Sequence, residues 1–130
     1  MDNSPRAVLS RAAPQPIGPY SQAVACGPWI FVSGQIPLDP ASGEIVAGDV
    51  TVQAERVLQN LRAVLEAAGA SLVSVVRTTI YLVDLSHFQA VNKVYARHFT
   101  SEPAPARSTV QVAKLPLGAL VEIDAIAHRA

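Results

Sequence analysis

Hydrophobic residues between positions 50 and 68 recur at the spacing of an α-helix. Counted from Val50, the apolar side chains lie at offsets of 0, 4, 7, 8, 11, 14, 15 and 18, which places them on one face. Asp49 or Thr51 can cap the start of this helix, and Gly69 stands where a left-handed residue after a helix is favoured. The pattern predicts an amphipathic helix over residues 50–68 that buries its apolar face.

Five other segments are rich in β-branched or alternating apolar residues and predict strands: residues 22–26, 29–32, 75–83, 107–113 and 120–128. Gly27 and Pro28 separate the first two segments and predict a hairpin. The third segment predicts a central strand. Because strands joined by a tight connection pair antiparallel, we expect the last two to be neighbours, with Arg107 near the end of the last strand and Glu122 nearer the turn, one strand over.

A second helix is predicted after Ser86, which can cap its start. Its apolar face consists of Phe88, Val91, Tyr95 and Phe99. The order of the elements predicts an α+β sandwich of the form β-β-α-β-α-β-β, with both helices on one face of a mixed sheet. Residues 1–16 are expected to form a loosely tethered N-terminal arm that contains at most one short strand, residues 7–10.

The final predicted strand carries apolar residues on both of its faces. Positions 121, 123, 125 and 127 are apolar, and Leu120 and Ile126 lie on the opposite face with Glu122 and Asp124. Because both predicted helices lie on one side of the sheet, they leave the second face uncovered. A face exposed to water would carry more polar residues than this strand does. We therefore expect an oligomer that buries this face, with any site on it at a subunit boundary.

Length and composition limit the classes of protein that fit. The chain has 130 residues, 50% of them hydrophobic, with ten basic and ten acidic side chains. The length predicts one domain over residues 1–130, and the balance of basic and acidic side chains makes nucleic acid an unlikely partner. The apolar runs are too short to span a membrane, and the single cysteine, Cys26, excludes a disulfide framework, which together favour the cytoplasm. Cys26 predicts a buried, unreactive thiol, and no motif for a cofactor or a metal is present.

Arg107 and Glu122 are the most informative candidates for chemistry. Each is a polar member of an alternating strand, and a surface ion pair between them is one interpretation. The other is a binding site, because a guanidinium on an apolar face is a bidentate receptor for a carboxylate and a nearby glutamate can position a water. Ser33 and Gly34 follow a predicted strand and would add a hydroxyl and a backbone N–H group.

Five motifs in order resemble the RidA family, also known as YjgF: IGPYSQAV (17–24), VSGQIP (32–37), the loop at 43–45, PARSTVQVAKLP (105–116) and VEIDAIA (121–127). The resemblance implies a chorismate-mutase-like fold and a homotrimer in which three sheets close a barrel with clefts between subunits. It also implies hydrolysis of reactive 2-imino acids, or their enamine tautomers, to 2-keto acids and ammonia, without metal or cofactor. The partners would be small imino and keto acid carboxylates.

The resemblance also assigns roles to residues. Arg107 matches the family's carboxylate-binding arginine and Glu122 its water-associated glutamate. Where many members have cysteine this chain has Thr109, whose backbone carbonyl would orient the water or the imine nitrogen. The remaining substrate-binding positions match Tyr20, Ser33, Gly34 and Asn92. Without the resemblance, Tyr20 would be interpreted as a loop anchor and Asn92 as a solvated helix position.

Several alternatives stay open at the level of sequence. Some family members are described as endoribonucleases or translation inhibitors, although the neutral net charge and the seven aromatic residues argue against a general RNA-binding surface. A non-catalytic protein that binds small metabolites in the same clefts is the other alternative. The sequence does not separate 2-iminobutanoate and 2-iminopropanoate from bulkier imines or aminoacrylate-type substrates.

Overall fold

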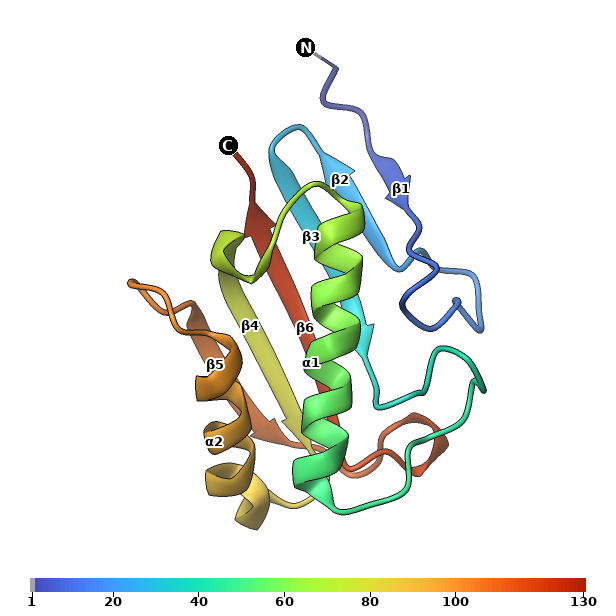
Figure 1. Ribbon diagram of the computed structural model, residues 1–130, viewed down its shortest axis with the longest axis vertical. Coiled ribbons are helices and arrows are strands. Elements are labelled where there is room, and N and C mark those ends of the chain that lie inside the picture. The colour runs from blue at the N-terminus through green and yellow to red at the C-terminus, as the bar shows by residue number, and fades with distance from the viewer. Residues whose placement is uncertain (1) are drawn as a thin grey trace.

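Six strands form one sheet in the computed structural model, which describes residues 2–130, and the strand order is β1-β2-β3-β6-β4-β5. The strands are β1 (Arg6–Val8), β2 (Ala23–Cys26), β3 (Trp29–Gln35), β4 (Val75–Leu82), β5 (Ala106–Gln111) and β6 (Val121–His128). Two helices, α1 (Val50–Ala67) and α2 (Phe88–His98), cover the same face (Figure 1). All strand pairs are antiparallel except β4 with β5, so the predicted α+β architecture with a mixed sheet is confirmed.

The helix α1 begins and ends where its sequence predicts. The Asp49 carboxylate accepts a hydrogen bond from the backbone N–H of Val52 at 3.1 Å, so Asp49, not Thr51, is the cap. Gly69 has φ +78°, the left-handed conformation that glycine adopts without strain after a helix. The buried stripe includes Leu58, Leu61 and Leu65, which pack in the core against the sheet. Within the described residues, none of the helices has the length and apolar character needed to cross a membrane.

The start of α2 differs from the prediction that Ser86 caps it. Asp84 accepts a hydrogen bond from the Ser86 backbone N–H at 2.9 Å and caps a short 3₁₀ turn, Leu85–His87, before α2 begins at Phe88. The carboxylate two residues earlier therefore takes the capping position that the serine hydroxyl was predicted to fill. The helix is fastened to the sheet by Tyr95, whose hydroxyl lies 2.8 Å from Thr78 Oγ1 in β4.

The prediction that the last two strands are neighbours is wrong. The strand β4 lies between them, pairing in parallel with β5 and antiparallel with β6. The chain between β5 and β6 includes a 3₁₀ turn, Pro116–Gly118, and is not a tight hairpin, so it can pass across the end of β4. The central position predicted for residues 75–83 is confirmed, because β4 has a partner strand on each side.

The sheet face opposite the helices carries apolar as well as polar side chains. Phe31 in β3 is 47% exposed and pairs with Ile126 of β6, which is half-buried on the same face. Val110 of β5 is also exposed there, beside Tyr81 of β4. These residues agree with the expectation of an apolar second face, and the trimer inferred from it remains a prediction.

The N-terminal segment is held to the sheet more firmly than a loose arm. β1 pairs with β2 and is shifted from the predicted residues 7–10 to Arg6–Val8. The buried Gln22 side chain accepts from the backbone N–H of Ser10 at 2.6 Å and donates to the carbonyl of Pro14 at 2.8 Å. This amide satisfies the buried backbone groups of the segment and fixes its path beside β2.

Candidate active site

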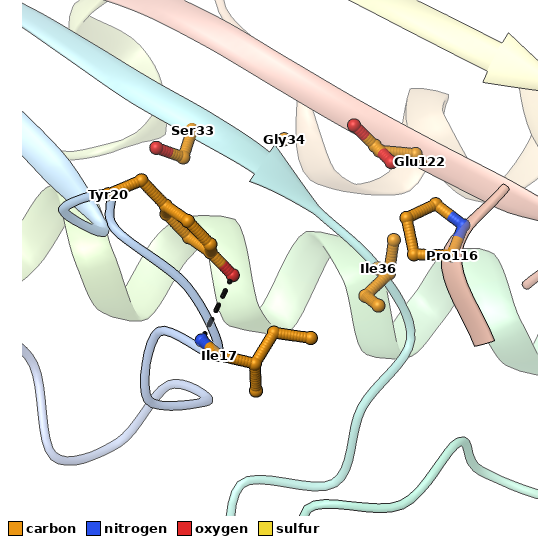
Figure 2. Close-up of a pocket in the computed structure, with 7 residues that line it drawn as sticks. All are labelled: Ile17, Tyr20, Ser33, Gly34, Ile36, Pro116 and Glu122. Atoms are coloured by element: carbon orange, nitrogen blue, oxygen red, sulfur yellow. Dashed lines mark hydrogen bonds between the residues drawn. The ribbon is translucent and has the colours of Figure 1, made fainter.

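A cavity of about 350 Å³ lies where β3 ends beside the start of β6 (Figure 2). Four residues that were predicted to form the site line this cavity together: Tyr20, Ser33, Gly34 and Glu122. Ile17, Ile36 and Pro116 complete its wall. The sequence assigned no role to these three positions, although all three fall within the quoted motifs.

A β-bulge brings Gly34 against the carboxyl group of Glu122. Val32 pairs with Ala125 and Gln35 with Ile123, so β3 has one residue more than β6 across this interval. A Cβ atom on Gly34 would lie 2.7 Å from Glu122 Cδ and 3.1 Å from Cγ, closer than real Cβ contacts normally are. Glycine leaves this space to the Glu122 side chain, and a Cβ at position 34 would displace the carboxyl group.

Ser33 and Tyr20 are both anchored to the backbone of the cavity wall. The Ser33 hydroxyl donates to the Ser21 carbonyl at 2.6 Å, which leaves its oxygen free to accept a hydrogen bond from a ligand. Its backbone N–H is bonded to the carbonyl of Gln22 at 2.9 Å, so Ser33 does not offer the free N–H group that was expected of the Ser33-Gly34 pair. The Tyr20 hydroxyl accepts from the backbone N–H of Ile17 at 3.4 Å (Figure 2).

The electrostatic environment of Glu122 favours its neutral form. Burial of the carboxyl raises the pKa of Glu122 above the ordinary value for glutamate, and the charge of Asp124 on the same face of β6 raises this pKa further. Asp124 is itself fastened, because the Tyr81 hydroxyl donates to its Oδ2 at 2.9 Å. A carboxyl group with a raised pKa can both give and take a proton nearer neutral pH, as general acid–base catalysis requires.

The other three predicted residues form a second group, on β5 and α2. The Arg107 guanidinium carbon lies 4.9 Å from the centre of the Tyr95 ring and 5.5 Å from that of Phe88, within the range of cation–π contacts. Asn92 is four residues after Phe88 and three before Tyr95, and therefore lies on the same side of α2. Thr109 follows Arg107 on the same face of β5, and its hydroxyl is buried without a partner within residues 2–130.

The two groups are separated within one chain. Arg107 pairs with Thr78, whose side chain faces the helices, whereas Glu122 pairs with Tyr81, three residues further along β4 and on the opposite face. The expectation that Arg107 and Glu122 lie on adjacent strands is therefore wrong, and within one chain their side chains lie on opposite faces of the sheet. An ion pair between them, the alternative interpretation, is also absent from the described part of the chain, where the salt bridge found joins Glu55 and His98.

Other chemically capable side chains lie outside the cavity. Cys26 is half-buried, not buried as predicted, and its thiol donates to the carbonyl of Asn3 at 2.9 Å. His98 Nε2 lies 2.9 Å from Glu55 Oε1 and links α2 to α1. Across residues 2–130, no three histidine, cysteine, aspartate or glutamate side chains gather in a set that could hold a metal ion.

Fold and cavity together define a small α+β protein with a carboxyl-bearing cavity on the face of its sheet that the helices leave open. The chain belongs to the endoribonuclease L-PSP family, whose sequence profile matches residues 10–129. Solved structures of RidA and YjgF proteins have the same fold, so the resemblance to that family is confirmed.

Individual relatives cover nearly the whole chain. Protein DfrA of Myxococcus xanthus is 60% identical over 124 residues, which are 94% of this chain and 94% of DfrA. The human protein named 2-iminobutanoate/2-iminopropanoate deaminase is 47% identical over 123 residues, or 94% of this chain and 89% of the human protein. The crystal structure of E. coli TdcF with bound serine matches with a TM-score of 0.90 at 43% identity, covering 96% of this chain and 99% of TdcF.

Proposed function

We propose that this protein hydrolyses 2-imino acids and their enamine tautomers to 2-keto acids and ammonia. The observation that carries the proposal is the cavity in which Glu122, with its raised pKa, lies against Gly34 beside the Ser33 hydroxyl. The name of the human relative supports this chemistry. The serine bound to TdcF supports a ligand of the size and charge of a small amino acid, which a 2-imino acid resembles.

The site is completed between subunits in this proposal. Within one chain Arg107 and Thr109 lie on the other side of the sheet from Glu122, so in this proposal they and Asn92 complete the cavity of a second copy. The exposed apolar face that carries Phe31 and Ile126 supports an assembly that buries it, and a homotrimer is the assembly implied by the family resemblance. Light scattering should return a mass of about three times 13.7 kDa, and a monomer would contradict this part of the proposal.

The reaction then follows from the positions of these groups. The substrate carboxylate binds the Arg107 guanidinium, which fixes the C2 imine beside Glu122. Neutral Glu122 donates its proton to the imine nitrogen, and the resulting iminium carbon becomes electrophilic. A water held by the Glu122 carboxylate and the Thr109 carbonyl adds to C2 and returns its proton to Glu122. The carbinolamine then collapses to the keto acid as its nitrogen leaves as ammonia.

The required acceleration is modest, because free imines already hydrolyse in water. Positioned proton transfer contributes typically about 10²- to 10⁴-fold, and fixing the imine near the acid adds to it. A metal or a redox partner is not needed for the balance of this reaction, in which one water is consumed and one ammonia is released.

The test is the rate of ammonia and keto acid release from imines that an amino acid oxidase generates in the assay. Alanine and 2-aminobutyrate as oxidase substrates supply 2-iminopropanoate and 2-iminobutanoate, and leucine and phenylalanine supply bulkier imines. We expect release to be faster with the protein than without it, most of all for the small side chains. No acceleration for any imine by the folded protein would overturn the proposal.

Two other functions are distinguished by companion measurements. The name of the endoribonuclease L-PSP family favours testing RNA cleavage, and a salt-dependent cleavage that disappears in Arg107→Ala would support an endoribonuclease. Saturable binding of 2-ketobutyrate without faster imine decay would instead support a non-catalytic binding protein.

A further inference from the structure

Two carboxyl groups on the open face of β6 differ in their hydrogen bonding. Glu122 and Asp124 are two residues apart, so their side chains leave the same face of the strand, roughly 7 Å apart along it. Asp124 accepts a hydrogen bond from the Tyr81 hydroxyl at 2.9 Å. Within residues 2–130 no side chain or backbone group donates a hydrogen bond to the Glu122 carboxyl, which opens into the cavity.

The hydrogen bond fixes one of the two carboxyl groups. The Tyr81 hydroxyl holds the Asp124 carboxyl in place on the open face of β6, beside Glu122. Burial raises the pKa of Tyr81, and the bond to Asp124 raises it further, so the phenol keeps its proton and remains a donor. Burial of the Glu122 carboxyl raises its pKa, and the charge of Asp124 on the same face raises this pKa further.

Other groups that face the pair do not cancel this effect. From β4, Arg77 is the cation on the same face, but its guanidinium donates to Ser108 Oγ at 2.7 Å and is turned toward β5. From β3, the neighbours of Glu122 are Ser33 and Gly34, which carry no charge. In the proposed assembly Arg107 of another copy approaches Glu122, and the substrate carboxylate offsets that positive charge when it binds.

We propose that Asp124, held by the Tyr81 hydroxyl on the same face of β6 as Glu122, is a positioning residue that favours the proton-carrying form of Glu122, the proton donor for the imine nitrogen. This inference rests on the proposed function. It adds a distinct role for the pair Asp124 and Tyr81, neither of which lines the cavity. The pair acts through the charge state of Glu122 and not through contact with the substrate.

The direct test is a carboxyl ¹³C NMR titration of protein labelled in glutamate, with the Glu122 resonance assigned by its loss in Glu122→Gln. In Asp124→Asn we expect the pKa of Glu122 to fall by roughly 0.4 to 1.7, the effect of a like charge about 7 Å away for an effective dielectric constant between that of water and about 20. Tyr81→Phe should lower it by less, because Asp124 keeps its carboxyl but loses its donor. Glu66→Gln, which removes one carboxylate from the exposed side of α1, is the matched control and should leave the titration unchanged.

The pH dependence of imine hydrolysis is the second readout. In Asp124→Asn the alkaline limb of kcat/KM should move to lower pH by the same amount as the Glu122 titration, whereas the rate at low pH should stay near that of the parent. A merely structural role would lower the rate at every pH. If Asp124→Asn assembles as the parent does but the pKa of its Glu122 is unchanged, the inference is overturned.

The two readouts also separate the inference from the function on which it rests. The NMR titration needs no turnover, so it tests the coupling of Asp124 to Glu122 directly. Absence of imine hydrolysis in the parent protein would overturn the proposed function, and the assignment of Glu122 as donor with it, whatever the titration shows.

Discussion

A methyl group at position 34 tests whether the placement of Glu122 limits the reaction. Gly34 does not have a positive φ, so Gly34→Ala introduces no backbone strain. The new Cβ would lie 2.7 Å from Glu122 Cδ, whereas ordinary contacts begin at 3.4 Å. Glu122 Oε2 lies closer still to this Cβ, so the carboxyl group must move by about 1 Å or more, and the cavity that it lines gives it room to do so.

This displacement should reduce catalysis far more than stability. Misplacement of a reacting group by about 1 Å costs on the order of 100-fold in rate, so we expect kcat/KM for 2-iminobutanoate to fall by roughly 10- to 100-fold. Overpacking of this kind costs typically about 1 to 3 kcal/mol of unfolding free energy, and the open cavity places Gly34→Ala at the lower end. The measurements are keto acid release from oxidase-generated imines and thermal unfolding of the same preparations.

Two further variants show whether the loss arises from the Glu122 carboxyl. Gly18→Ala is the control, because its Cβ would lie at an ordinary 3.5 Å from the Tyr20 ring. In a Glu122→Ala background, Gly34→Ala should cause no additional loss, since the group that it displaces is gone. A full rate in Gly34→Ala, or losses that multiply in the double variant, would refute the assignment of Glu122 as a positioned proton donor.

Other expected outcomes follow from the remaining residues. The kcat/KM of Arg107→Lys should fall by the equivalent of about 2 to 5 kcal/mol of transition-state binding, because an ammonium cannot form the bidentate contact with the substrate carboxylate. A rate equal to that of the parent would show that Arg107 has a structural role. The hydrogen bond from His98 holds the pKa of Glu55 below its usual range, so Glu55 stabilises the fold above the unfolded-state pKa of glutamate and this contribution is lost as the pH falls through the lowered value. Chemical denaturation should therefore show Glu55→Gln less stable than the parent by roughly 0.5 to 1 kcal/mol near pH 6 and equal to it at pH 3. Cys26→Ala and EDTA should leave imine hydrolysis unchanged, and inactivation by EDTA that zinc or manganese reverses would contradict a mechanism based on water and Glu122 alone.

Patterns within short stretches of the sequence were enough to predict most of the fold. The helix from Val50 was predictable because apolar spacing, the Asp49 cap and the left-handed Gly69 act within a few residues of one another. The hairpin of β2 and β3 was predictable for the same reason, since Gly27 permits the positive φ that its turn requires. The quoted motifs identified the family and also supplied the four residues that the cavity brings together.

Only the tertiary structure decided which strands are neighbours and which residues share a face. The strand β4 lies between β5 and β6, and its register places Arg107 beside Thr78 on the helix side and Glu122 beside Tyr81 on the open side, a separation that alternation within each strand does not encode. The bulge brings Gly34 against Glu122, which is 88 positions away in the sequence. The hydrogen bond from Tyr81 to Asp124 likewise joins residues that are 43 positions apart. Alternation along a strand determines which side chains lie together, but register and strand order are set by packing of the whole sheet against its helices, so the chemistry of the cavity emerges only once the chain has folded.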